Sequence, residues 1–272
     1  MKHGAKRRFR LSSAQWTAII AFVLSFLAFG AVFLLPPLLS RWERPKPMEA
    51  LGEEGKQRTL LLFIHDEGEL TGAVALCSDT GRMQIRATGY PACTEVVYKT
   101  ALRQLSECYA AEGSATAGFL SAVTGERYDV VISFSVESLG AFVARLGNGI
   151  SYTLPERVGA LPEGEQTLSA LQIADVLSFA DWEEGAVGQA AVHAGIVAAV
   201  CNRYLTPRCD ITQAFNVLTG LCDERLTVAQ FLVIKPELEQ LAQTNQGAIC
   251  VYAVPDGRMT GIGEARRFVL TE

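Results

Sequence analysis

The residues best suited to chemistry lie close together in the sequence. His65 and Asp66 are adjacent and could act as an acid–base pair, and Glu69 follows as a further carboxylate. Arg82 and Arg86 are four residues apart on an expected strand, where alternation places them on one face. Two guanidinium groups on one face could bind an anion such as a phosphate together.

Each of these residues also has an ordinary structural interpretation. A single histidine at a strand end is more often structural than catalytic, and separate arginines are mostly solvated. Ser178 lacks the Gly-x-Ser-x-Gly turn of a nucleophilic serine. The sequence also contains no glycine-rich phosphate loop and no spacing typical of a metal site. The residue types alone therefore indicate no particular reaction.

An apolar segment near the N-terminus has the length of a membrane span. No residue from Leu11 to Ser40 is charged, and Trp16–Leu35 supplies twenty largely apolar residues. At about 1.5 Å each, they cover a hydrocarbon core of about 30 Å. A cleaved signal peptide ending near Gly30 is the alternative, but the apolar run continues beyond that point, which favours retention as an anchor.

The charges and prolines around this segment predict the organisation of the chain. Five basic residues precede it and three follow it before position 47, which favours a cytoplasmic N-terminus. Four prolines between positions 36 and 47 indicate a stiff stalk. We expect a single-pass protein of the cell membrane, with a cytoplasmic tail (1–15), a transmembrane anchor (16–35), a Pro-rich stalk (36–58) and an extracytoplasmic domain (59–272).

The rest of the chain predicts an α/β domain, a mixed sheet sandwiched between helices. The hydrophobic content of 49% suffices for a packed core, and the net charge of −5 gives no basis for nucleic-acid binding. Apolar runs predict strands at Thr59–His65, Gly72–Cys77, Met83–Thr88, Tyr128–Phe134 and Ala248–Val254. Helices are expected at Thr94–Ala110, Ser114–Val123, Ser135–Leu146, Gln166–Phe179, Asp181–Leu205, Ile211–Leu218 and Thr227–Thr244. Pro236 should interrupt the last of these or start its second piece. The Asp181–Leu205 segment could also span a membrane, but its glycines and polar flanks favour a buried core helix.

Seven cysteines are distributed without a close C-x-x-C pair. On an exported domain they invite disulfides, but the odd number favours mostly buried free thiols, with one surface bridge left open. A zinc site is disfavoured because His193 is the only histidine near the later cysteines.

Several short sequence segments, and their order along the chain, resemble those of the LytR–CpsA–Psr family. Its conserved domain is also called the cell envelope-related transcriptional attenuator domain. These proteins are membrane-anchored and extracytoplasmic. The resemblance extends from about Thr59 to Phe268. It is carried by LLLFIHD at 60–66, Asp79-Thr80-Gly81-Arg82, Ser106–Gly113, Tyr128–Phe134, Leu146–Ile150 and Gly164–Leu168.

The resemblance implies transfer of a glycopolymer from a polyprenyl pyrophosphate to peptidoglycan. Arginines would hold the pyrophosphate, an acidic residue would hold Mg²⁺ or activate the acceptor, and an apolar groove would take the lipid. The family's first arginine position falls on Glu67, whereas Glu69 retains an acid and Gln189 a polar side chain. No Lys or Arg occurs between Arg157 and Arg203, where the family has further arginines. Losing three or four phosphate contacts would forfeit about 5–10 kcal/mol.

The sequence leads to two hypotheses for the function, one of a binding protein and one of an enzyme. The favoured hypothesis is a non-catalytic protein that binds a lipid-linked or cell-wall component, for which a polyprenyl-phosphate-linked glycan, peptidoglycan or a protein partner are candidates. The alternative is an active transferase that uses Glu69 as the acid, Arg82 or Arg86 as replacement cations, and Mg²⁺. The acidic side chains around the expected mouth would repel a pyrophosphate. They are Glu67, Glu69, Asp181, Glu183 and Glu184.

The apolar groove leads to a prediction with two outcomes. The Gln166–Phe179 and Asp181–Leu205 helices carry many small residues, which could line an open channel for a lipid. The same small residues could instead let the second helix pack closely on the sheet and close the channel. The small residues are Gly185, Ala186, Gly188, Ala190, Ala191, Ala194 and Gly195.

Overall fold

The computed structural model describes residues 57–147, 149–223, 226–261 and 266–271. The predicted tail, the anchor at 16–35 and the stalk up to residue 56 lie outside the described residues. Residues 57 and 58, assigned to the stalk, already belong to the first strand. Within the described part of the chain, no helix combines the length and apolar character required to cross a membrane.

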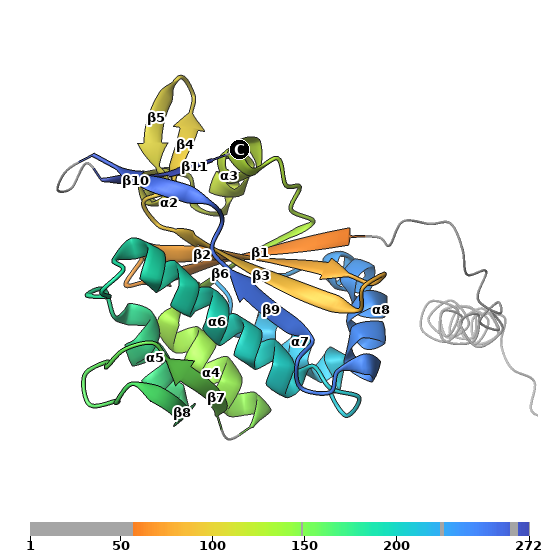
Figure 1. Cartoon of the computed structure of the whole chain (residues 1–272). Helices are drawn as coiled ribbons and strands as arrows, with labels where there is room; N and C mark the ends of the chain where they lie inside the picture. The colour runs from red at the N-terminus through yellow and green to blue at the C-terminus, as the bar shows by residue number, and fades with distance from the viewer. Residues whose placement is uncertain (1–56, 148, 224–225, 262–265, 272) are drawn as a thin grey trace, which may run out of the picture. The chain divides into compact units, whose positions relative to one another are not determined.

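A five-stranded mixed sheet forms the centre of the fold (Figure 1). Strands β1 (Gln57–Asp66), β2 (Glu69–Asp79) and β3 (Gln84–Pro91) form an antiparallel meander in the middle. Strand β6 (Val130–Ser135) adds to β1 and strand β9 (Cys250–Ala253) adds to β3, both in parallel. The five predicted strands are therefore all present.

Strand β1 shows why the sheet is buried on both faces. Its side chains alternate between two hydrophobic cores, with Leu61 and Phe63 in one and Leu62 and Ile64 in the other. A continuous apolar run is the pattern of such a doubly covered strand. The prediction for the Thr59–His65 segment is confirmed.

Helices flank the sheet on both faces, as Figure 1 shows, so the predicted α/β class is confirmed. One face carries α2 (Leu105–Glu112), the short 3₁₀ turn η1 (Gly113–Thr116) and α3 (Ala117–Thr124). The larger core on the other face is built with α4 (Val136–Leu146), α5 (Ala170–Ser178), α6 (Ala186–Tyr204), α7 (Ile211–Thr219) and α8 (Val228–Thr244). Helix α6 is a buried core helix.

Three small hairpins were not predicted from the sequence. They are β4 (Glu95–Tyr98) with β5 (Ala101–Gln104), β7 (Ile150–Leu154) with β8 (Gly164–Leu168), and β10 (Gly257–Thr260) with β11 (Arg267–Leu270).

The prediction of one helix over Thr94–Ala110 is wrong in its first half. Val96 is buried and Val97 is 46% exposed, which is the alternation of a strand with one covered face. Lys99 takes a positive φ of 58° in the turn, and the helix begins only at Leu105. The β-branched and aromatic residues of this segment outweigh its helical spacing.

Three helix predictions need smaller corrections. The predicted Gln166–Phe179 helix begins at Ala170, because residues 164–168 pair with β7 and Ser169 forms a capping box. The predicted Asp181–Leu205 helix begins at Ala186, after Gly185 at a φ of 62°. Pro236 does not interrupt α8, which runs through it.

Six cysteines are free thiols, which agrees with the prediction that most are unpaired, but only two of these six are buried. Both Cys108 and Cys250 are buried, and burial raises the pKa of the Cys108 thiol. The free thiols are Cys77, Cys93, Cys108, Cys201, Cys209 and Cys250.

Candidate functional site: an apolar cavity with a charged end

An apolar cavity of about 230 Å³ lies between the sheet and the helices of the larger core. Its floor is the sheet, with side chains such as Leu62, Leu76 and Phe134. An apolar cavity of about 150 Å³ is enough to bind benzene. This cavity is therefore large enough for part of an apolar chain.

Four helices form the wall of the cavity opposite the sheet. Helix α6 contributes only its C-terminal half, from Val197 onward, and α4 contributes Phe142. Helices α7 and α8 contribute Phe215 and Phe231, whose rings stack with centroids 4.0 Å apart. The walls thus come from segments far apart in the sequence.

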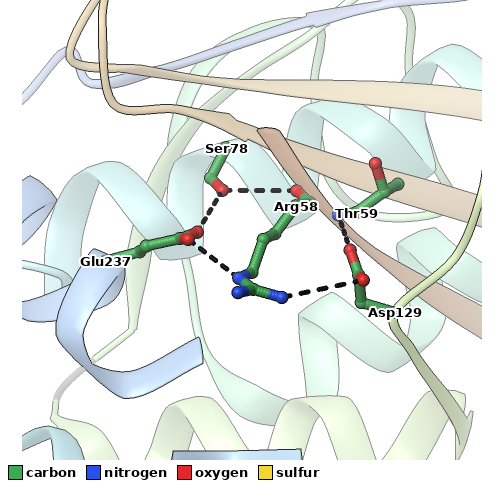
Figure 2. A network of polar contacts seen from close by, with 5 residues as sticks. All are labelled: Arg58, Thr59, Ser78, Asp129 and Glu237. Carbon is green, nitrogen blue, oxygen red and sulfur yellow. Dashed lines mark hydrogen bonds and ion pairs between the residues drawn. The ribbon is translucent and has the colours of Figure 1, made fainter. Parts of the chain in front are cut away.

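Three residues that line the cavity, Arg58, Ser78 and Glu237, form a polar network with Asp129, which lies outside the lining (Figure 2). The Nε of Arg58 donates to Oε1 of Glu237 at 2.8 Å, and the Oγ of Ser78 lies 3.1 Å from Oε2 of the same carboxylate. The Nη1 of Arg58 is 3.8 Å from Oδ1 of Asp129, whose Oδ2 accepts from the backbone N–H of Thr59 at 3.0 Å. We call Arg58, Ser78, Asp129 and Glu237 the polar end.

The polar end is assembled by sheet pairing and by one helix. Arg58 and Ser78 are direct partners in the register of β1 and β2, and Glu237 comes from α8. Helix α8 is fixed at its start by a capping box between Thr227 and Gln230. The side chains of Arg58 and Glu237 are 31% and 14% exposed, so the pair is partly shielded from water. Two carboxylates against one guanidinium leave an excess of one negative charge.

The small residues of α6 do not line this cavity. A Cβ at Gly89 of β3 would lie 2.1 Å from the carbonyl oxygen of Ala190, and one at Gly72 of β2 would lie 2.7 Å from Nδ1 of His193. The N-terminal half of α6 therefore packs directly on the sheet. The small residues of α6 therefore let the helix pack closely on the sheet and do not line an open channel. The cavity lies beside this contact, along the C-terminal half of the helix.

The residues predicted to act as a site are held by other partners. Glu69 is exposed at the start of β2, and Nε2 of Gln189 donates to the carbonyl oxygen of Phe179 at 3.2 Å. Arg82 lies in the turn before β3, not on the strand, with 82% of its side chain exposed and 3.7 Å from Asp79. None of these residues lines the cavity.

Arg86 lies on the opposite face of the sheet from the cavity. Its neighbours Ile85 and Ala87 belong to the larger core, and strand alternation directs Arg86 away from it. Its Nη2 is 3.6 Å from Glu126. The structure therefore does not bring Arg82 and Arg86 together around one anion.

His65 pairs with Asp223, not with the neighbouring Asp66. Its Nε2 is 2.5 Å from Oδ2 of Asp223, in the segment between α7 and α8, and its ring stacks at 6.2 Å on Tyr109. No local pattern indicates this pair, since the two residues are 158 positions apart in the chain. In the described ranges, no three His, Cys, Asp or Glu side chains are grouped to hold a metal.

No family model matches the sequence, and no curated protein matches it. Solved structures do match. A putative transcription regulator from Eubacterium siraeum superposes with a TM-score of 0.68 at 11% identity, over 84% of this chain and 93% of the other. TagV of B. subtilis gives a TM-score of 0.64 at 13% identity, over 80% and 92%. TagT of B. subtilis gives 0.60 at 12% identity, over 84% and 89%.

TagV and TagT are LytR–CpsA–Psr proteins. This chain shares their fold. Identities of 11–13% establish the likeness of the folds and nothing finer. The match spans nearly the whole length of the other chains, so the fold that the sequence resemblance implied is the one observed.

Proposed function

We propose that this chain is a divergent LytR–CpsA–Psr-like protein of the bacterial cell envelope that binds an apolar chain without catalysing transfer. The observation that carries the proposal is the apolar cavity between the sheet and α4, α6, α7 and α8. Cavities lined by apolar residues with a few polar groups at one end are typical ligand sites. The bound component would be a lipid or a lipid-linked wall component, held by burial of its chain.

The membrane segment at 16–35 supports this proposal from the sequence. An anchored domain outside the cell would meet membrane lipids at high local concentration. The expected location is the cell membrane, with residues 1–15 cytoplasmic and the α/β domain outside.

The transferase alternative has less support. Arg82 and Arg86 are largely exposed and lie apart, so they do not form the paired guanidinium site that a pyrophosphate needs. The cation at the cavity, Arg58, is already bound by Glu237. If the alternative held, purified chain would transfer polymer from a polyprenyl pyrophosphate to peptidoglycan, and Glu69→Gln would abolish that transfer.

Two cysteines of the cavity provide a direct test of binding. Cys201 and Cys209 line the cavity, so a bound chain should slow their alkylation by N-ethylmaleimide. The full chain in phosphatidylcholine discs would be treated with increasing farnesol, a chain-like apolar alcohol. Alkylation would be followed for each cysteine by mass spectrometry, with Cys93, outside the cavity, as the internal control.

A matched pair of variants makes the test specific. Ala214→Leu adds three carbons inside the cavity and should remove the protection, whereas Ala110→Leu makes the same change on an exposed face of α2 and should leave it intact. Absence of protection in the unmodified chain would reject lipid binding and leave a protein partner as the candidate.

A further inference from the structure

We infer that the cavity prefers an amphiphile with an uncharged hydroxyl head over the corresponding phosphate. This inference rests on the proposed binding of an apolar chain and names the class of head group at the polar end. It follows from the charges and hydrogen bonds of Arg58, Ser78, Asp129 and Glu237.

The charge of the polar end disfavours an anion. Among the described residues that line the cavity, Arg58 is the only Lys or Arg, and its guanidinium faces the carboxylates of Glu237 and Asp129. At the cavity the guanidinium is already neutralised by Glu237, and Asp129 outside the lining adds a second carboxylate, so a phosphate placed there would add one or two uncompensated negative charges. Interactions between like charges are strong at partly shielded sites, where the effective dielectric constant is lower than in water.

The hydrogen-bonding groups suit a hydroxyl. A carboxylate can accept about four hydrogen bonds, and Glu237 has Arg58 and Ser78 as donors within reach, so it can accept another. A guanidinium has five N–H donors, and among the described residues only Nε and Nη1 of Arg58 have acceptors, the latter at the long distance of 3.8 Å. An alcohol can donate to the carboxylate and accept from the guanidinium, without any uncompensated charge.

The rest of the cavity suits the chain of such an amphiphile. Apart from the polar end, the space is lined mostly by Leu, Ile, Val and Phe side chains, together with Thr59, Tyr204, Ala214, Cys201 and Cys209. The tail of the molecule would therefore lie along the sheet, and its head would reach Arg58 and Glu237.

The experiment compares farnesol with farnesyl monophosphate on the full chain, using protection of Cys201 and Cys209 as the readout. Farnesol is expected to protect at a concentration at least tenfold lower than the phosphate. The two probes partition differently into the discs. The decisive quantity is therefore the ratio of their protecting concentrations, compared between variants.

Glu237→Gln keeps the shape of the side chain but removes the excess negative charge, so it should reduce the preference for farnesol at least threefold. Glu239→Gln makes the same change in the same helix, at an exposed residue outside the cavity, and should leave the ratio unchanged. The double variant Glu237→Gln with Asp129→Asn should shift the preference further toward the phosphate, since both carboxylates that face Arg58 in the described part of the chain are then uncharged.

The possible outcomes separate the two proposals. If the phosphate protects as well as farnesol, or if Glu237→Gln and Glu239→Gln behave alike, the head-group inference is overturned and lipid binding stands. If neither probe protects the cavity cysteines, lipid binding fails and the inference fails with it.

Discussion

Gly89 of β3 lies so close to Ala190 of α6 that a Cβ on the glycine would be 2.1 Å from the alanine carbonyl oxygen. Only a residue without a side chain fits between the strand and this helix. The contact decides where the cavity can form, because it holds the N-terminal half of α6 on the sheet and leaves space only beside the C-terminal half.

The first prediction concerns this contact. Gly89→Ala should lower the free energy of unfolding by about 2–3 kcal/mol, since the obstacle is backbone and cannot rotate away. Thermal or urea unfolding followed by circular dichroism measures the change. Gly118→Ala is the control, because a Cβ there meets nothing within 4 Å and the residue lies in α3. The control should be neutral or more stable.

The second prediction concerns the end of helix α6. The side-chain amide of Asn245 donates to the carbonyl oxygen of Leu205 at 2.5 Å and to that of Asn202 at 3.1 Å, and its Oδ1 accepts from Gly247 N–H at 2.7 Å. Asn245→Ala should cost about 2 kcal/mol, because carbonyls at the helix end lose their donor. Asn245→Asp should cost at least as much at neutral pH, since a carboxylate would face carbonyl oxygens. Equal stability of all three proteins in urea would contradict this role.

The third prediction concerns acid stability. Complete burial lowers the pKa of His193 from 6.5 to about 4. As the pH falls below about 6.5, the unfolded chain takes up a proton that the folded chain does not, so stability is lost progressively down to about pH 4. The loss attributable to this residue is about 3 kcal/mol. Urea unfolding at pH 7.5 and pH 4.5 should show a smaller difference in His193→Gln than in the unmodified chain.

The fourth prediction concerns the polar end in the absence of ligand. Arg58→Met leaves the carboxylates of Glu237 and Asp129 without their cation and should lower the free energy of unfolding by about 1–2 kcal/mol. Arg82→Met is the comparison, because its ion pair is largely exposed and contributes little. Similar unfolding midpoints for both variants would show that Arg58 has no stabilising role.

The sequence predicted the elements whose patterns are local. Continuous apolar runs identified β1 and β6, because strands covered on both faces carry no polar alternation. The β4–β5 hairpin was missed because its four-residue strands are too short for a clear period, and their pairing depends on the turn at Lys99.

The site was much harder to predict. Arg58 and Glu237 are 179 residues apart, and nothing in either local segment indicates that they meet. The candidates that the sequence did suggest, Arg82 and Arg86, were chosen for spacing along one strand. In the structure, one of them precedes the strand and the other lies on the face away from the cavity. Convergence of side chains depends on tertiary packing, which spacing does not encode.

Helices α7 and α8 share a small core of their own, centred on the stacked rings of Phe215 and Phe231. A helical pair with internal packing can detach from the sheet as one cooperative unit, at a lower free energy than global unfolding. Since this pair forms one side of the cavity, such transient opening would widen the way in for a bulky hydrophobic molecule. Amide hydrogen exchange in α7 and α8 should accordingly be faster than in the central strands, and slower once a ligand is bound.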